Sequence, residues 1–284
     1  MDRWLVRVGR FVGAALGAFA GLVAVQFMRL RRTAFLPGWP GFRVNHLVQP
    51  AAGRSTAEPL TLVVLGDSTT AGVGVSRPQD ALPFLLARRV ADAEARPVRV
   101  ISYGWAGARA SDLPGQQVAH ASGVRRRPDE TGPVLRDADV VAIVIGSNDA
   151  THRTPPGRFR ASLRATLEQV REQAPGARIV LGGIPRFRGA LRALEPLIFM
   201  ADQYARLLRP ISRGEAARAG AAYGDIHGRV PALIAGRTDV LSSDGFHPSA
   251  VLYDAWARVI FEALQEGPAS AADVPSAPME PAGA

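Results

Sequence analysis

Short apolar runs alternate with longer helical patterns from residue 60 onward, and this alternation restricts the fold more than any other feature. The run from Val140 to Ile145 is continuous and rich in β-branched residues, as expected for a strand covered on both faces. The predicted strands are 60–65, 98–103, 140–145, 178–181 and 221–226, and the predicted helices are 81–95, 158–174, 197–219 and 249–265. Strands that alternate with helices predict an α/β fold: a five-stranded parallel sheet with helices on both faces.

A stretch of 18 residues without a charged side chain, Phe11 to Met28, precedes this pattern. As a helix it would span roughly 27 Å, close to the thickness of a bilayer core. An uncleaved anchor is favoured over a cleaved signal peptide, because the residues around the end of the stretch, Val25 to Arg29, form a poor cleavage site. A buried helix is a further alternative. We therefore expect one transmembrane helix at the N-terminus.

The rest of the chain divides by composition. We expect an anchor with basic flanks over 1–32, a Pro- and Gly-rich linker over 33–58, and a catalytic domain over 59–266. Residues 267–284 contain four prolines and mostly small residues, which predicts a disordered tail.

The net charge of +9 raises the question of nucleic-acid binding, but its distribution argues against it. Residues 1–43 hold seven arginines and one acidic residue, so +6 of the +9 flanks the apolar stretch. The domain therefore lacks the basic stripe that nucleic acid requires. Because the chain has no cysteine, disulfides, cysteine nucleophiles and cysteine-based zinc sites are excluded. The oligomeric state is left open.

Four short polar motifs fall at the ends of predicted strands or just before the last helix. They are Gly66-Asp67-Ser68, Gly104-Trp105-Ala106-Gly107, Gly146-Ser147-Asn148-Asp149 and Asp244-Gly245-Phe246-His247-Pro248. Ligands of open α/β sheets bind at the carboxyl ends of the strands. We therefore expect the four motifs to meet at one edge of the sheet.

These residue types suit acyl transfer. Ser68 is a candidate nucleophile, His247 can take its proton, and Asp244 can hold the imidazole in the required tautomer. The backbone N–H groups of Ser68 and Gly107 and the side-chain amide of Asn148 could form an oxyanion hole.

Six other residues are given lesser roles. Trp105 and Phe246 could line an acyl pocket, with core packing as the alternative. Asp67 and Asp149 are expected to brace turns. Asp225 and His227 form a second acid–imidazole pair, which we place at the end of a strand without a catalytic role.

The four motifs, in this order, resemble the blocks of the GDSL/SGNH hydrolase family (lipases and esterases similar to lysophospholipase L1), over about residues 60–265. The letters S, G, N and H correspond to Ser68, Gly107, Asn148 and His247. The chain departs from the family pattern at Thr69, usually Leu, and at Tyr103, often Asn. The resemblance implies a three-layer, flavodoxin-like α/β/α fold, hydrolysis of esters or thioesters, and no metal or cofactor.

The sequence thus predicts a membrane-anchored serine ester hydrolase that acts on a small-molecule or lipid ester, including esters of the cell envelope. An acyltransferase on the same scaffold and a catalytically silent, membrane-anchored binding protein are the alternatives. Three arginines in the short tail before the apolar stretch favour an extracytoplasmic domain, whereas the three that follow it favour a cytoplasmic one. Because long domains translocate largely regardless of charge, the extracytoplasmic side is preferred.

Overall fold

The structure is a computed structural model that describes residues 2–32, 45–123, 135–187 and 195–268. Part of the predicted linker, 33–44, and the predicted disordered tail from residue 269 lie outside these ranges. The described strands form one sheet of six strands in the order β1-β3-β2-β4-β5-β6. They are β1 (Asn45–Val48), β2 (Leu60–Gly66), β3 (Val98–Ser102), β4 (Val140–Val144), β5 (Arg178–Gly182) and β6 (Ala222–Gly224).

The five strands from β2 to β6 are parallel, as the alternating pattern predicts. The predicted count of five strands was wrong by one, because β1 pairs antiparallel with β3 at the sheet edge. This strand comes from the segment interpreted as a linker. It has only four residues, of which only Val48 is buried, so it lacks the continuous apolar run by which buried strands are recognised.

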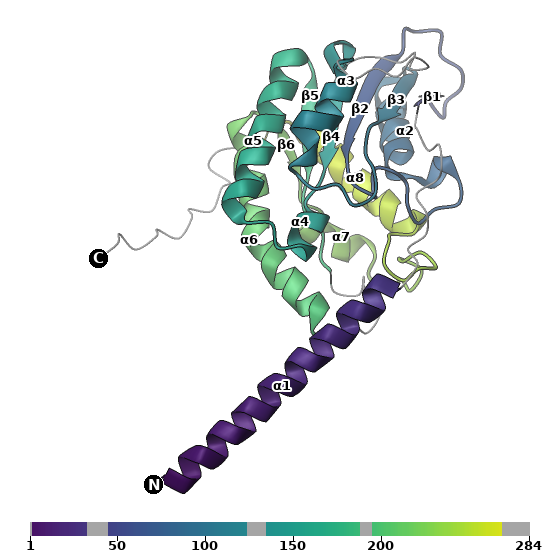
Figure 1. Ribbon diagram of the computed structural model, residues 1–284. Helices are drawn as coiled ribbons and strands as arrows, with labels where there is room; N and C mark the ends of the chain where they lie inside the picture. The colour runs from purple at the N-terminus through teal and green to yellow at the C-terminus, as the bar shows by residue number, and fades with distance from the viewer. Residues whose placement is uncertain (1, 33–44, 124–134, 188–194, 269–284) are drawn as a thin grey trace.

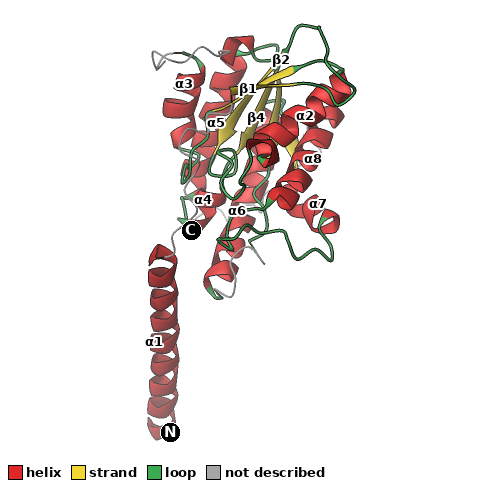
Figure 2. Ribbon diagram, turned by 90° about the vertical axis from the view of Figure 1, so that its right-hand side faces the viewer, coloured by secondary structure: helices red, strands yellow, loops and turns green. Residues whose placement is uncertain are grey.

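Helices cover both faces of the sheet, which gives the predicted three layers (Figures 1 and 2). The helices of the domain are α2 (Leu82–Glu94), α3 (Ala119–Ala121), α4 (Ser147–Thr151), α5 (Pro156–Gln173), α6 (Leu197–Arg218), α7 (Ile226–Leu233) and α8 (Ala250–Glu266). Three short segments complete the described elements: the 3₁₀ turns η1 (Pro78–Asp80) and η3 (Leu135–Asp137), and a π-helical turn, η2 (Leu113–Val118).

Alternate residues of each central strand enter two separate cores. Leu62 and Val64 pack with α2, α7 and α8, whereas Val63 and Leu65 pack with η2, α5 and α6. Each strand is therefore apolar on both faces, which is why its sequence is a continuous apolar run.

The first helix, α1 (Asp2–Arg32), projects from the domain as one continuous rod (Figure 1). Its segment Trp4–Gln26 is long and apolar enough to cross a membrane, and no part of that segment's most apolar window is buried by the protein. A signal sequence near the N-terminus also meets these criteria of length and composition.

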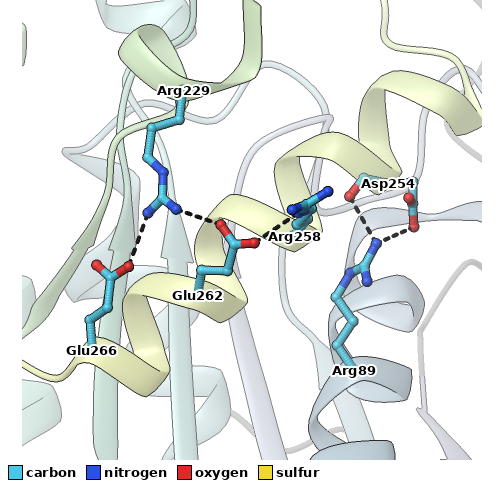
Figure 3. Close-up of polar contacts among 6 residues, drawn as sticks. All are labelled: Arg89, Arg229, Asp254, Arg258, Glu262 and Glu266. Atoms are coloured by element: carbon cyan, nitrogen blue, oxygen red, sulfur yellow. Dashed lines mark hydrogen bonds and ion pairs between the residues drawn. The ribbon is translucent and has the colours of Figure 1, made fainter. Parts of the chain in front are cut away.

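Ion pairs fix the last helix to its neighbours (Figure 3). Arg229 of α7 contacts Glu262 and Glu266 of α8, and Arg89 of α2 contacts Asp254 of α8 at 2.6 Å. These side chains are partly exposed, so each pair adds little stability. Their effect is to hold the helix that directly follows the His247 motif.

The two-sided core predicts that a buried and an exposed leucine contribute very differently to the free energy of unfolding. Replacing Leu163, which is fully buried on α5, by alanine should lower the free energy of unfolding by about 2–5 kcal/mol, because a cavity remains. The control Leu207→Ala removes the same atoms from a side chain that is 55% exposed on α6, and should change stability by less than about 0.5 kcal/mol. Urea unfolding of the full chain in detergent, followed by circular dichroism, measures both. Equal losses would contradict the assigned core.

Candidate active site

Ser68 lies in a tight turn directly after β2. The turn is closed by the N–H groups of Thr70 and Ala71, which both donate to the carbonyl of Asp67. Gly66 has no space for a side chain, because a Cβ would lie 2.2 Å from the carbonyl oxygen of Val144 on β4. The sequence therefore needs glycine here to bring the end of β2 against β4.

A buried glutamine holds the same glycine. Gln117, from the π-helical turn η2, accepts the N–H of Gly66 through Oε1 and donates to the carbonyl of Gly66 through Nε2, each at 2.7 Å. Both backbone groups at the end of β2 are thus satisfied by one side chain that is completely buried. Gln117 lies 51 residues along the chain from its partner, so no local motif in the sequence indicates this role.

Asp67 braces the turn, as expected. Its Oδ1 accepts the backbone N–H of Thr69 at 3.0 Å and the hydroxyl of Thr69 at 2.8 Å. Burial raises the pKa of Asp67 to about 6, against the lowering effect of these bonds, and the nearby Asp149 carboxylate also raises it. The side chain is buried and points into the turn, which fits a structural role.

The motif after β4 holds the loop that contains Gly107. Asn148 Nδ2 donates to the carbonyl of Ala108 at 2.9 Å, and Asp149 Oδ2 accepts the N–H of Ala110 at 2.9 Å. Gly107 adopts a φ of +84°, in the region that favours glycine. The Asn148 amide and the backbone of the Gly107 loop are therefore fixed side by side.

The carboxylate of Asp244 orients His247. Its Oδ1 accepts from the Ser242 hydroxyl and from the N–H groups of Phe246 and His247, and its Oδ2 lies 2.7 Å from His247 Nδ1. Burial opposes ionisation of Asp244, but these hydrogen bonds outweigh it and hold its pKa well below the usual value. An ionised Asp244 therefore faces Nδ1 and leaves Nε2 as the nitrogen that can act on a substrate.

Two contacts join the His247 loop to the Ser68 loop. The hydroxyl of Tyr253 on α8 donates to the carbonyl of Val73 at 2.6 Å, and both residues are buried. Gly74 packs so closely that a Cβ would lie 2.5 Å from the carbonyl oxygen of Pro248. Close packing therefore brings together two loops that lie far apart in the sequence.

One pocket at this edge of the sheet contains four of the predicted site residues, Ser68, Asn148, Phe246 and His247. It is lined by Ser68, Thr69, Ser147, Asn148, Pro185, Arg186, Phe187, Leu241, Phe246, His247, Pro248, Leu252 and Trp256. Gly107 and Asp244 are not part of this lining, but Asn148 binds the carbonyl of Ala108, next to Gly107, and His247 contacts Asp244. Phe246 lines the pocket, whereas Trp105 lies outside the lining set and packs, half-buried, against the core.

Most residues of the pocket wall lie outside the four sequence motifs. Pro185, Arg186 and Phe187 follow β5, whose carboxyl end lies at the same edge of the sheet, so strand order could have indicated them. Leu252 and Trp256 lie one turn apart on α8, and their role depends on how that helix packs.

The second acid–imidazole pair, Asp225 and His227, lies at the start of α7, where Asp225 stabilises the local structure. Its predicted place at the end of a strand was wrong, because β6 already ends at Gly224. Asp225 instead caps α7, accepting the N–H of Gly228 at 2.9 Å, and it pairs with Arg213 at 3.0 Å. Burial, together with nearby arginines, lowers the pKa of His227.

Comparisons with known proteins identify the family of the chain. Residues 64–255 match the GDSL-like Lipase/Acylhydrolase family. A GDSL-like esterase of Mycobacterium tuberculosis is 28% identical over 216 residues, which are 75% of this chain and 64% of that protein. The chain thus spans somewhat less than two thirds of that relative.

Solved structures show the same fold. A lipase from a goat rumen metagenome has a TM-score of 0.56 at 19% identity, covering 72% of this chain and 97% of its own. A lipase/acylhydrolase from Enterococcus faecalis has a TM-score of 0.52 at 23% identity, covering 75% and 100%. Since the family pattern covers more than half of the chain, this protein belongs to the GDSL-like lipase/acylhydrolase family.

Proposed function

We propose that the protein hydrolyses carboxylic esters through an acyl-enzyme formed on Ser68. The observation that carries this proposal is the Asp244–His247 pair, joined at 2.7 Å, whose imidazole lines the same pocket as Ser68. An imidazole held by a carboxylate beside a serine hydroxyl is the arrangement that activates serine as a nucleophile.

In the first half-reaction, Ser68 Oγ attacks the ester carbonyl while His247 Nε2 takes the hydroxyl proton. The imidazolium, stabilised by Asp244, then gives this proton to the leaving alcohol as the C–O bond breaks. In the second half-reaction, water gives a proton to Nε2 and attacks the acyl carbon. The proton returns to Ser68 Oγ as the acid leaves.

The negative charge on the carbonyl oxygen needs donors that are already in place. The N–H groups of Ser68 and Gly107 and the amide of Asn148 are the proposed oxyanion hole. Asn148 supports this role because one of its N–H bonds is committed to Ala108, which fixes the amide and leaves its second N–H for the oxyanion.

The pocket wall suggests the kind of acyl group. Leu241, Phe246, Leu252 and Trp256 form an apolar surface next to His247. An aliphatic or aromatic acyl chain would be desolvated there, whereas a highly polar acyl group would lose its hydration without compensation. We therefore propose esters of apolar acids as substrates.

Two alternative functions, an acyltransferase and a silent binding protein, predict experimental results that differ from those of a hydrolase. An acyltransferase would pass the acyl group from Ser68 to an added alcohol and form a new ester, which product analysis detects. A silent binding protein would leave Ser68 unreactive, so a fluorophosphonate would not label it.

We further propose that α1 is an uncleaved anchor and that the domain lies on the extracytoplasmic side. The apolar segment reaches to Gln26, where the helix contacts the domain, and no break in the helix separates it from the following basic residues.

Ser68→Ala should abolish esterase turnover, because the attacking oxygen is lost. His247→Ala should cost nearly as much, and the double variant little more, since residues that act as one unit are not additive. Initial rates on a soluble aryl ester measure all three, and fluorophosphonate labelling of the unmodified protein verifies Ser68. Independent, multiplicative losses would show that the two residues do not act together.

Asn148→Ala should lower kcat by about 10²–10³ with little change in KM, because the amide acts on the developing oxyanion. Ser147→Ala, the adjacent residue in the pocket lining, is the matched control and should keep most of its turnover. An effect on KM alone would assign Asn148 to substrate binding.

Protease treatment of intact cells that express the full chain should cleave the protein and release an active domain, because the domain is proposed to lie outside. A cytoplasmic marker protein must remain intact. Protection until the cells are lysed would place the domain inside, and a full-length protein found wholly in the soluble fraction would remove the anchor.

A further inference from the structure

The end of the apolar segment of α1 touches the catalytic domain at one defined place. Gln26, the last residue of this segment, is buried, and its side-chain amide donates to the carbonyl of Glu195, just before α6. The rest of the segment is exposed or only half-buried. The first turn of α6 therefore lies at the level where the apolar segment ends.

The same side of the domain carries the active site. Figures 1 and 2 show α4, α7 and the start of α6 on the side from which α1 projects. These elements follow the carboxyl ends of the strands, where Ser68, Asn148 and His247 meet. If α1 spans a bilayer, this edge of the sheet faces the bilayer.

Helix α6 is connected to the pocket wall by buried polar contacts of Asp202 and Arg209, which follow its first turn. Asp202 accepts the N–H of Phe187 at 3.3 Å. Arg209 donates to the carbonyl groups of Ile184 and Pro185 and pairs with Asp202 at 2.9 Å. One face of α6 thus fixes the loop after β5, which forms part of the pocket wall.

The outer side of this turn has the composition of a membrane-contacting surface. Phe199 is 45% exposed, and Met200 is partly exposed beside it. Arg153, which is exposed, places its guanidinium 3.9 Å from the sulfur of Met200, and Arg186 is exposed at the pocket. Exposed apolar side chains flanked by cations suit the boundary between acyl chains and anionic headgroups.

We propose that this turn, Leu197–Met200, rests on the lipid surface with Phe199 among the headgroups, so that an ester substrate enters the pocket directly from the bilayer. The position of Phe199 depends only on α1 being a membrane helix. The route of the substrate rests, in addition, on the ester hydrolysis proposed above.

The position of Phe199 can be measured without any activity. The chain has no cysteine, so Phe199→Cys places a single nitrobenzoxadiazole probe on the full-length protein in vesicles of phosphatidylcholine with a minority of phosphatidylglycerol. We expect quenching by lipid-attached nitroxides and protection from aqueous iodide. Gly176→Cys is the matched control: it is exposed in the turn before β5, at the opposite edge of the sheet, with space for a side chain.

The control probe should be quenched by iodide and unaffected by the lipid nitroxides. If the probe at position 199 behaves like the control, the proposed surface is wrong. Since neither result depends on catalysis, a protein that hydrolyses no ester would refute the proposed function and leave this measurement valid.

The substrate route has its own test. Phe199→Asp should lower turnover of a long-chain ester embedded in these vesicles about tenfold relative to turnover of a soluble short-chain ester, because a charge opposes contact with lipid. Phe199→Leu keeps an apolar side chain and should keep the ratio of the two activities. An unchanged ratio in Phe199→Asp would contradict delivery from the bilayer.

Discussion

The close approach of β2 and β4 at Gly66 is the constraint on which the site depends. No side chain fits between Gly66 and the carbonyl of Val144, and Gln117 binds both backbone groups of Gly66 from below. Because the end of β2 is fixed on two sides, the turn that follows has one position for Ser68. A serine on a flexible loop would need to be ordered in every catalytic cycle, at a cost in free energy.

The other site residues are held by contacts between loops. The Asn148 amide is fixed on Ala108, and His247 is fixed on Asp244. Tyr253, at the start of α8, ties that helix to the Ser68 loop. These contacts are buried or half-buried, where an unpaired polar group is costly, so the network favours one arrangement. The proposed chemistry therefore depends on polar groups that are already oriented before a substrate binds.

In our proposal, the point where helix α1 meets the domain determines how the active site faces the lipid surface. The helix meets the domain at Gln26, beside the first turn of α6, and α6 fixes the wall of the pocket through Asp202 and Arg209. A tether at the opposite edge of the sheet would hold the pocket away from the lipid surface. In this proposal, the place where α1 meets the domain allows esters embedded in the bilayer to reach Ser68.

The sequence by itself determined the parallel strands, the four long helices α2, α5, α6 and α8, and the four polar motifs, because apolar periodicity, continuous β-branched runs and strand-end motifs are local features. Only the tertiary structure decided that the short, mostly exposed strand β1 closes the sheet edge, that Gln117 holds Gly66, and that Trp105 packs against the core while Trp256 lines the pocket. These features depend on contacts between residues far apart in the chain. The local sequence around these residues would be the same with or without such a partner. Only the packing of the folded chain therefore reveals these contacts.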